Sequence, residues 1–439
     1  MIDAIILTRL NAGDADFSKR LERVLQRDML ISDTITESVK SILHDVRAEG
    51  DEALLRYTRK FDGFDVATMA DVVVEQDQLQ ASLESISANQ RDALGLAAER
   101  IRSYHEKQRQ QSWQYSESDG SVYGQKITPL ERVGIYVPGG KANYPSSMLM
   151  LGIPAMVAGV EEIVATVPTQ YNPAGNLVFA AAALAGVSRV FTVGGAQAIG
   201  ALAYGTQSIP KVDKIAGPGN VYVTAAKKMV FGEVGIDMVA GPSELTIVCD
   251  GGTDPDWIAM DLFSQAEHDE QAQSILISTD LSFLEAVQES IDRLLPTMSR
   301  ADIIRSSLVN RGAFIYAASE SVAADVVNAI APEHLELSVS DPSNLLGLVR
   351  HAGAIFLGRY TAEALGDYCA GPSHVLPTSG SARFFSALGV YDFQKRSSII
   401  SCSAEGASML AKTASALARD ESLEAHALSA EYRLKKTSH

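Results

Sequence analysis

The fold is decided by Val133-Gly134-Ile135-Tyr136-Val137, which the turn Pro138-Gly139-Gly140 separates from the apolar stretch Ser147–Val160. The first run predicts a strand, the turn ends it, and the apolar stretch has the length of a buried helix. Three more pairs of strand and helix follow: Glu162–Val167 with Leu177–Ala185, Ser188–Val193 with Ala196–Tyr204, and Lys214–Ala216 with Asn220–Val230. Repeated strand–turn–helix units are typical of a parallel sheet with helices on its faces.

A second alternation begins near residue 245. Its predicted strands are Leu245–Val248, Ser274–Ser278, Ser307–Asn310, Ala313–Ala317 and Ala354–Leu357. Segments with a helical pattern, such as Asp256–Glu267 and Ser282–Leu295, separate them. We therefore predict an α/β protein with two Rossmann-like doubly wound α/β domains, one inserted in the other.

The predicted boundaries divide the chain into four parts. They are a helical N-terminal arm (1–27), a larger α/β domain (28–132 and 245–388), a second α/β domain (133–244) and a helical C-terminal tail (389–439). Residues 78–111 carry apolar side chains at helical spacing, so the region before the first sheet is predicted to be helical.

The composition is that of a globular protein with more than one core. The chain has 439 residues, 46% of them hydrophobic and 21% charged, whereas single cores rarely extend beyond about 250–300 residues. A net charge of −17 disfavours nucleic acid and anionic membranes as partners, since both demand a basic surface. Three cysteines are too few for a disulfide framework. No signal peptide or membrane-spanning stretch is visible, so we expect a cytoplasmic protein.

Three glycine-rich turns are predicted at one end of the first sheet. Polar side chains accompany them: Tyr136, Gln197 and Asn220. Open α/β sheets bind ligands at this end, where helix N-termini favour anions. No turn matches the Gly-x-Gly-x-x-Gly dinucleotide pattern, but three converging turns favour a cofactor site over turns that serve only chain reversal.

Two short segments carry candidate chemistry. Ser264–Asp269 places Gln265 and His268 three residues apart in a helical region, where both would project from one face. Ala331–Leu337 places Glu333 and His334 after a proline, at the start of an extended stretch. Together the segments offer imidazole, amide and carboxylate groups, which suit a metal ligand set and a general base.

Both segments closely resemble motifs of the histidinol dehydrogenase family. So do Ala240–Glu244, Gly366–Tyr368, His374–Thr378 and, in the tail, Glu421 with Ala425–Ala427, and all occur in order along nearly the whole chain. The resemblance implies a zinc-dependent enzyme that uses two NAD⁺ in succession to oxidise L-histidinol through L-histidinal to L-histidine. It also implies a homodimer whose tails cross, so that each tail completes the partner's active site.

The resemblance further assigns roles to individual residues. The zinc ligands would be Gln265, His268, Asp367 and His426, and the acid/base residues Glu333 and His334. Substrate contacts would be these same ligands together with His334, Ser243 and Glu421, with His374 as a further contact. Tyr136, Gln197 and Asn220 would contact NAD. Ser373 stands where many members have Asn.

The proposed residues make chemical sense in these roles. Imidazole and oxygen ligands suit zinc, which would position a histidine-like substrate. Histidine, with an unperturbed pKa of about 6.5, is a suitable residue type at position 334 for a base that accepts a hydroxyl proton near neutral pH. The second oxidation needs a hydrated aldehyde, and Glu333 could activate that water.

Other interpretations remain open from the sequence. Cys369 could trap the aldehyde as a thiohemiacetal, although a packing role is favoured. A zinc hydrolase would need no dinucleotide turns, and a non-catalytic metal-binding protein would not need so many acid/base groups. Related proteins on the same scaffold oxidise other small polar alcohols, including a sulfonated diol.

Overall fold

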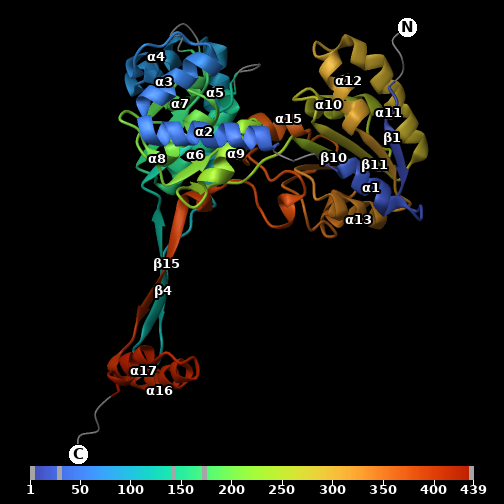
Figure 1. Cartoon of the computed structure of the whole chain (residues 1–439). Coiled ribbons are helices and arrows are strands. Elements are labelled where there is room, and N and C mark those ends of the chain that lie inside the picture. The colour runs from blue at the N-terminus through green and yellow to red at the C-terminus, as the bar shows by residue number, and fades with distance from the viewer. Residues whose placement is uncertain (1–4, 27–31, 140–143, 171–175, 435–439) are drawn as a thin grey trace, which may run out of the picture.

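The computed structural model describes residues 5–26, 32–139, 144–170 and 176–434. Gly140, part of the turn Pro168–Gly175, the 27/28 boundary and the last five residues of the tail therefore lie outside the described residues. The molecule consists of two α/β domains side by side and a long stalk that projects from one of them (Figure 1). No described helix is long and apolar enough to cross a membrane.

The first sheet confirms the four predicted strand–helix units. Its strand order is β2-β7-β6-β5-β8-β9, and all pairings are parallel except that of β2 with β7. The strands are β2 (Val73–Val74), β5 (Arg132–Tyr136), β6 (Glu162–Thr166), β7 (Arg189–Phe191), β8 (Lys214–Ala216) and β9 (Gly235–Ile236). The helices that follow them are α6 (Pro145–Ala158), α7 (Leu177–Leu184), α8 (Gly195–Tyr204) and α9 (Val221–Val230). Because α6 and α7 are buried on nearly every side, they lack the polar face of a surface helix.

The second sheet is wholly parallel, in the order β1-β12-β11-β10-β13-β14. Its strands are β1 (Thr8–Asn11), β10 (Glu244–Cys249), β11 (Gln273–Ser278), β12 (Ala313–Tyr316), β13 (His334–Ser338) and β14 (Ala354–Leu357). Its helices are α10 (Pro255–Ala266), α11 (Leu281–Leu294), α12 (Ala301–Arg311), α13 (Glu320–Ile330) and α14 (Pro342–Leu346). The predicted strand Ser307–Asn310 is wrong. It lies in α12, where Ile304, Ser307 and Leu308 are buried at helical spacing.

The N-terminal regions require two corrections. The segment 1–27 is not a purely helical arm, because β1 forms an edge of the second sheet before α1 (Phe17–Leu25). The segment 28–132 packs mainly with 133–244 rather than with 245–388, although its Arg100 also donates to the carbonyl oxygen of Cys369. Its helices contact the helices of the first sheet, α2 with α8, α4 with α7 and α5 with α6. These helices are α2 (Asp33–Glu49), α3 (Asp51–Tyr57), α4 (Gln76–Ser85) and α5 (Ala88–Glu106).

The predicted insertion of one domain in the other is confirmed: the segment that forms the first sheet lies in the chain between β1 and β10 of the second sheet. The chain enters the second sheet at β1, builds the whole first sheet, and returns at β10. The helices α2–α5 follow the inserted sheet because their apolar stripes complete its core, as Val39 and Leu54 do beside Ile199.

The C-terminal tail contacts the body through Val390 and Phe393, which are buried in the core of the first domain, and then continues as a strand. β15 (Gln394–Ser401) pairs with β4 (Val122–Pro129), which also pairs with β3 (Trp113–Ser116), all antiparallel. This stalk carries the hairpin of α16 (Ala404–Asp420) and α17 (Glu424–Glu431) at its far end (Figure 1). The helical tail is confirmed, and β15 is an element that the sequence pattern did not reveal. Short helical turns complete the chain: η1 (Thr58–Asp62), η2 (Met69–Asp71), η3 (Leu295–Thr297), α15 (Glu363–Leu365), η4 (Gly366–Ala370), η5 (Ser381–Arg383) and η6 (Val390–Phe393).

Candidate active site

A cleft of about 1020 Å³ is lined by residues of both α/β domains. Polar side chains from five segments reach it: Asn220, Ser243, His268, Glu333, His334, Asp367 and His374. Ser243 directly precedes β10, and His334 is the first residue of β13. The cleft therefore lies where several chain segments bring the two predicted motifs together.

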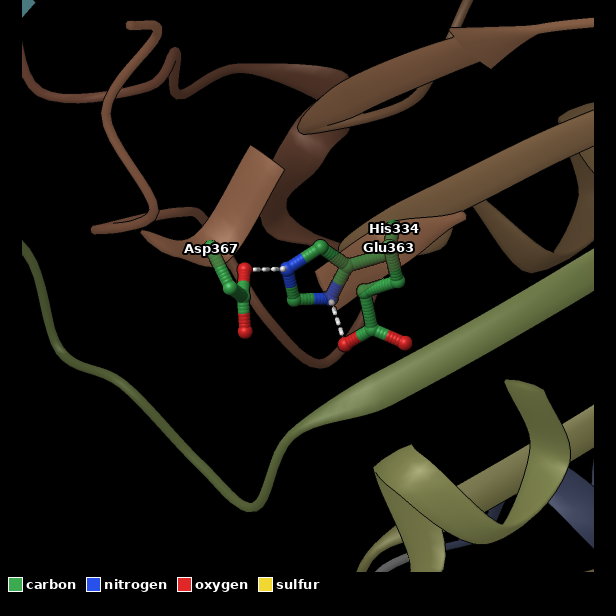
Figure 2. A group of neighbouring side chains, drawn as sticks. All are labelled: His334, Glu363 and Asp367. Atoms are coloured by element: carbon green, nitrogen blue, oxygen red, sulfur yellow. Dashed lines mark ion pairs between the residues drawn. The ribbon is translucent and has the colours of Figure 1, made fainter. Parts of the chain in front are cut away.

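His334 is held at both ring nitrogens. Its Nδ1 lies 3.0 Å from the carbonyl oxygen of Glu244 and 3.5 Å from a Glu363 oxygen, while its Nε2 lies 3.3 Å from Asp367 Oδ1. Figure 2 shows the two carboxylates on opposite sides of the imidazole. The position follows from the local sequence. Pro332 precedes the strand, and the pairing of His334 with Leu245 and Ala354 fixes the backbone.

The carboxyl groups around His334 raise the affinity of its imidazole for a proton. Burial alone would lower its pKa, but the negative charges of Glu363, Glu333 and Asp367 outweigh burial and raise the pKa well above its ordinary value. For Asp367, burial would raise the pKa, yet the hydrogen bond and charge of His334 lower it. The site thus holds an imidazole with unusually high proton affinity.

Glu333 is buried beside this imidazole. One of its oxygens accepts a hydrogen bond of 2.8 Å from the backbone N–H of Glu244. Burial raises the pKa of Glu333 to about 8, because the charge of His334 opposes that shift only in part. A carboxyl group with such a pKa is a stronger base than an ordinary one and still exchanges protons near neutral pH.

His268 lines the cleft just beyond the end of α10, and Gln265 lies three residues before it. The helix ends at Ala266, so Gln265 lies in its last turn and His268 just beyond it, rather than both within the helix. Both amide atoms of the Gln265 side chain are buried without a hydrogen-bond partner among the described residues. Burial lowers the pKa of His268, while the charge of Asp367 opposes that shift. A neutral imidazole, a carboxylate and an unsatisfied amide fit a metal ion by residue type.

A second candidate metal group overlaps the first at Asp367. His334, Glu363 and Asp367 have ligand atoms within 4.8 Å of one another. The two carboxylates of this group lie at different nitrogens of one ring (Figure 2), and a single nitrogen can offer its lone pair to only one ion. The arrangement indicates that the two carboxylates hold the imidazole in place rather than form a three-ligand metal site with it. It leaves Gln265, His268 and Asp367 as the metal ligands expected from this chain.

The three predicted cofactor residues meet in a neighbouring pocket of about 760 Å³. Tyr136 ends β5, and its hydroxyl accepts a hydrogen bond of 3.2 Å from the backbone N–H of Gly195. Burial raises the pKa of Tyr136 to about 12. Gln197 lies in the first turn of α8, while the Asn220 side chain caps α9 by accepting from the backbone of Tyr222. Asn220 and Pro138 line both the pocket and the cleft, so the two cavities are adjacent.

Two predicted residues lie outside the cleft of their own chain. Glu421 follows α16 and His426 lies in α17, and both side chains are exposed. Figure 1 places this hairpin at the end of the stalk, away from both α/β domains. The tail of one chain therefore does not contribute these side chains to that chain's own cleft.

Comparison with known proteins agrees with this geometry. A sequence profile described as histidinol dehydrogenase matches residues 25–434. The chain belongs to the histidinol dehydrogenase family. It is 63% identical to histidinol dehydrogenase from Pseudomonas aeruginosa over 428 residues, which covers 98% of this chain and 97% of that protein. Histidinol dehydrogenase from Dechloromonas aromatica is 57% identical over 430 residues, which is 98% of this chain and 99% of the relative. The crystal structure of histidinol dehydrogenase from Elizabethkingia anophelis superimposes with a TM-score of 0.92 at 33% identity and covers 99% of each chain.

In this histidinol dehydrogenase family member, the structure adds two residues to those expected from the motifs. Glu363 contacts His334, and Asp62 lines the pocket of Tyr136 and Gln197. Neither stands in a motif that indicates these contacts, although Glu363 lies four residues before Asp367. Cys369 packs partly buried against the first domain, and its carbonyl oxygen accepts from Arg100.

Proposed function

We propose that this chain is a zinc- and NAD-dependent L-histidinol dehydrogenase that oxidises L-histidinol to L-histidinal and then to L-histidine, the last steps of histidine biosynthesis. The observation that carries the proposal is His334, held between Glu363 and Asp367 in a cleft that Ser243 and His268 also line. A cytoplasmic location of the protein is part of the same proposal.

The metal ligands of this chain would be Gln265, His268 and Asp367. The fit rests on the buried, unsatisfied amide of Gln265 and on the imidazole of His268, whose pKa burial lowers, near the carboxylate of Asp367. Zinc at this position would anchor the imidazole and amine of the substrate and hold its side chain in a fixed orientation. His426 is the proposed fourth ligand and comes from a second subunit.

His334 is the proposed base for the hydroxyl proton. Because its Nδ1 is hydrogen-bonded to the Glu244 carbonyl, Nε2 is the atom that takes the proton. The carboxylate of Glu363 stabilises the imidazolium that results. Both oxidations release a proton, so His334 acts in both.

Glu333 is the proposed base for the water that hydrates the aldehyde. Its carboxyl lies beside His334 and has the raised pKa that such a step requires. Ser243 and Glu421 are proposed to bind the polar groups of the substrate, and His374 to line the cleft beside them. The ring of His374 is fixed by Ser147 and by the backbone oxygen of Asp367.

The cofactor would extend across both cavities. Tyr136, Gln197 and Asn220 are the proposed NAD contacts, and the pocket that they line shares Asn220 and Pro138 with the cleft. NAD supplies the hydride acceptor in each of the two oxidations.

A homodimer with crossed tails is proposed for the assembly. The exposed tail places Glu421 and His426 beyond the reach of their own cleft. The hairpin also exposes large apolar side chains, Met409, Leu410 and Leu417, as expected of a surface that packs against a partner. In a two-fold dimer each tail would complete the other subunit's site.

The reaction stoichiometry tests the function. Limiting L-histidinol should yield about two NADH per molecule, since each oxidation uses one NAD⁺. Chelation should abolish turnover and added zinc should restore it. A yield near one, with free aldehyde, would overturn the two-step reaction. Turnover of a sulfonated diol but not of histidinol would instead assign the chain to the alternative substrate.

A further inference from the structure

The pocket beside α8 contains a carboxylate that the proposed function does not use. Asp62 ends η1 and is the one acidic residue among the described residues that line this pocket. No Arg, Lys or His occurs among these same described lining residues. A pocket whose described lining residues include a carboxylate and no cation disfavours the 2′-phosphate that NADP carries and NAD lacks.

The position of the pocket indicates which part of the dinucleotide it holds. His334 and Asp367 line the cleft, so the nicotinamide ring must lie there to receive a hydride from the substrate. The pocket of Tyr136 and Gln197 adjoins that cleft at Asn220 and Pro138, which line both. The other half of the dinucleotide, its adenosine, therefore falls in the pocket with Asp62.

Asp62 is built into the start of α8. Its carboxylate accepts a hydrogen bond from the backbone of Gly194, and it lies 3.4 Å from Gln197 Nε2. Burial raises the pKa of Asp62 to about 6, so the group is ionised at mildly alkaline pH. The negative charge thus occupies the helix N-terminus, where a phosphate would otherwise be stabilised.

We propose that Asp62 is the residue that selects NAD over NADP, by accepting a hydrogen bond from the adenosine ribose and repelling a 2′-phosphate. A carboxylate that binds the ribose 2′-hydroxyl is the general solution in NAD-binding α/β folds, and arginine takes its place where NADP is bound. This inference rests on the proposed NAD-dependent function and assigns a determinant of its cofactor choice.

The experiment measures ligand binding to the zinc-loaded enzyme without turnover. Calorimetric dissociation constants of NAD⁺, NADP⁺, AMP, adenosine 2′,5′-bisphosphate and nicotinamide mononucleotide are compared for wild type, Asp62→Asn and Asp65→Asn. Asp65 is an exposed carboxylate three residues away and serves as the matched control. Asp62→Asn should reduce the preference for NAD⁺ over NADP⁺ by about tenfold or more, the worth of one charged hydrogen bond. It should weaken AMP and leave nicotinamide mononucleotide unchanged.

A second variant leaves Asp62 in place. Ser38 lines the same pocket from α2, and Ser38→Arg should strengthen binding of adenosine 2′,5′-bisphosphate relative to AMP, which keeps the test decisive if Asp62→Asn does not fold. An unchanged NAD⁺/NADP⁺ ratio in folded Asp62→Asn would overturn the inference, as would an effect on nicotinamide mononucleotide instead of AMP. If wild type binds neither NAD⁺ nor AMP, the proposed function fails as well.

Discussion

The cleft and the tip of the tail contrast sharply, although the resemblance assigns both to one active site. In the cleft, His334 and Glu333 are buried and contact carboxylate or backbone groups of the same chain. At the tip, Glu421 and His426 are exposed on a hairpin at the end of the stalk. In the proposed dimer with crossed tails, one chain would prearrange the proton chemistry, whereas the final metal and substrate contacts would depend on assembly.

The largest expected effect is in the cleft. His334→Asn should lower the rates of both oxidations by roughly 10²–10⁴-fold, because each requires transfer of a proton to a base. Rates measured separately with histidinol and with histidinal decide the outcome. Near-normal rates in a folded variant would show that the held imidazole is not the base.

Substitution of His426 at the tip should lower activity almost as much, but through the active site of the other subunit. His426→Ala homodimers should be nearly inactive, like His334→Asn homodimers. When the two variants are mixed by co-refolding, random pairing gives heterodimers with one intact site, and about a quarter of wild-type activity should return. A mixture that stays inactive despite proven heterodimers would place His426 in its own chain's site.

Glu333 should show a smaller and more selective effect. Glu333→Gln should slow the aldehyde step more than the alcohol step, by about 10²-fold, since only the aldehyde step requires an activated water. The ratio of the two rates is the measurement. Equal losses in both steps would remove its special role and leave Glu333 as a structural partner of the Glu244 backbone.

The smallest effect is expected at Cys369. Its side chain packs against the first domain, so Cys369→Ser should keep activity within about twofold, as surface and partly buried changes without a special contact usually do. Steady-state rates and the unfolding midpoint measured together separate chemistry from folding. A folded but inactive Cys369→Ser would revive the covalent mechanism.

The sequence predicted the parts of this molecule that depend on local patterns. The strand–turn–helix units around Tyr136, Gln197 and Asn220 were visible because short β-rich runs and glycine turns are local signals. The position of His334 at the start of a strand was visible because Pro332 precedes it.

Contacts between distant segments could not be predicted in the same way. Asp62 contacts Gln197, which lies 135 residues away in the sequence. Strand β4 pairs with β15, although Val122 lies in the first third of the chain and Ser401 lies near its end. No spacing rule specifies such partners. The prediction of a strand at Ser307–Asn310 was wrong for another reason, since a short run with few apolar residues fits a strand as well as one turn of a helix.

The edge strand β1 has a consequence for how the chain folds as it is made. Its partner β12 emerges from the ribosome about 300 residues later, which corresponds to roughly 15–60 s at 5–20 residues per second. During that delay every strand of the inserted sheet is already made, but its core still lacks Val375, Leu388, Val390 and Phe393, which follow β12 in the chain. The outer sheet must therefore keep its first strand unpaired until synthesis is well past the middle of the chain, and the cores of both domains are completed only late in synthesis.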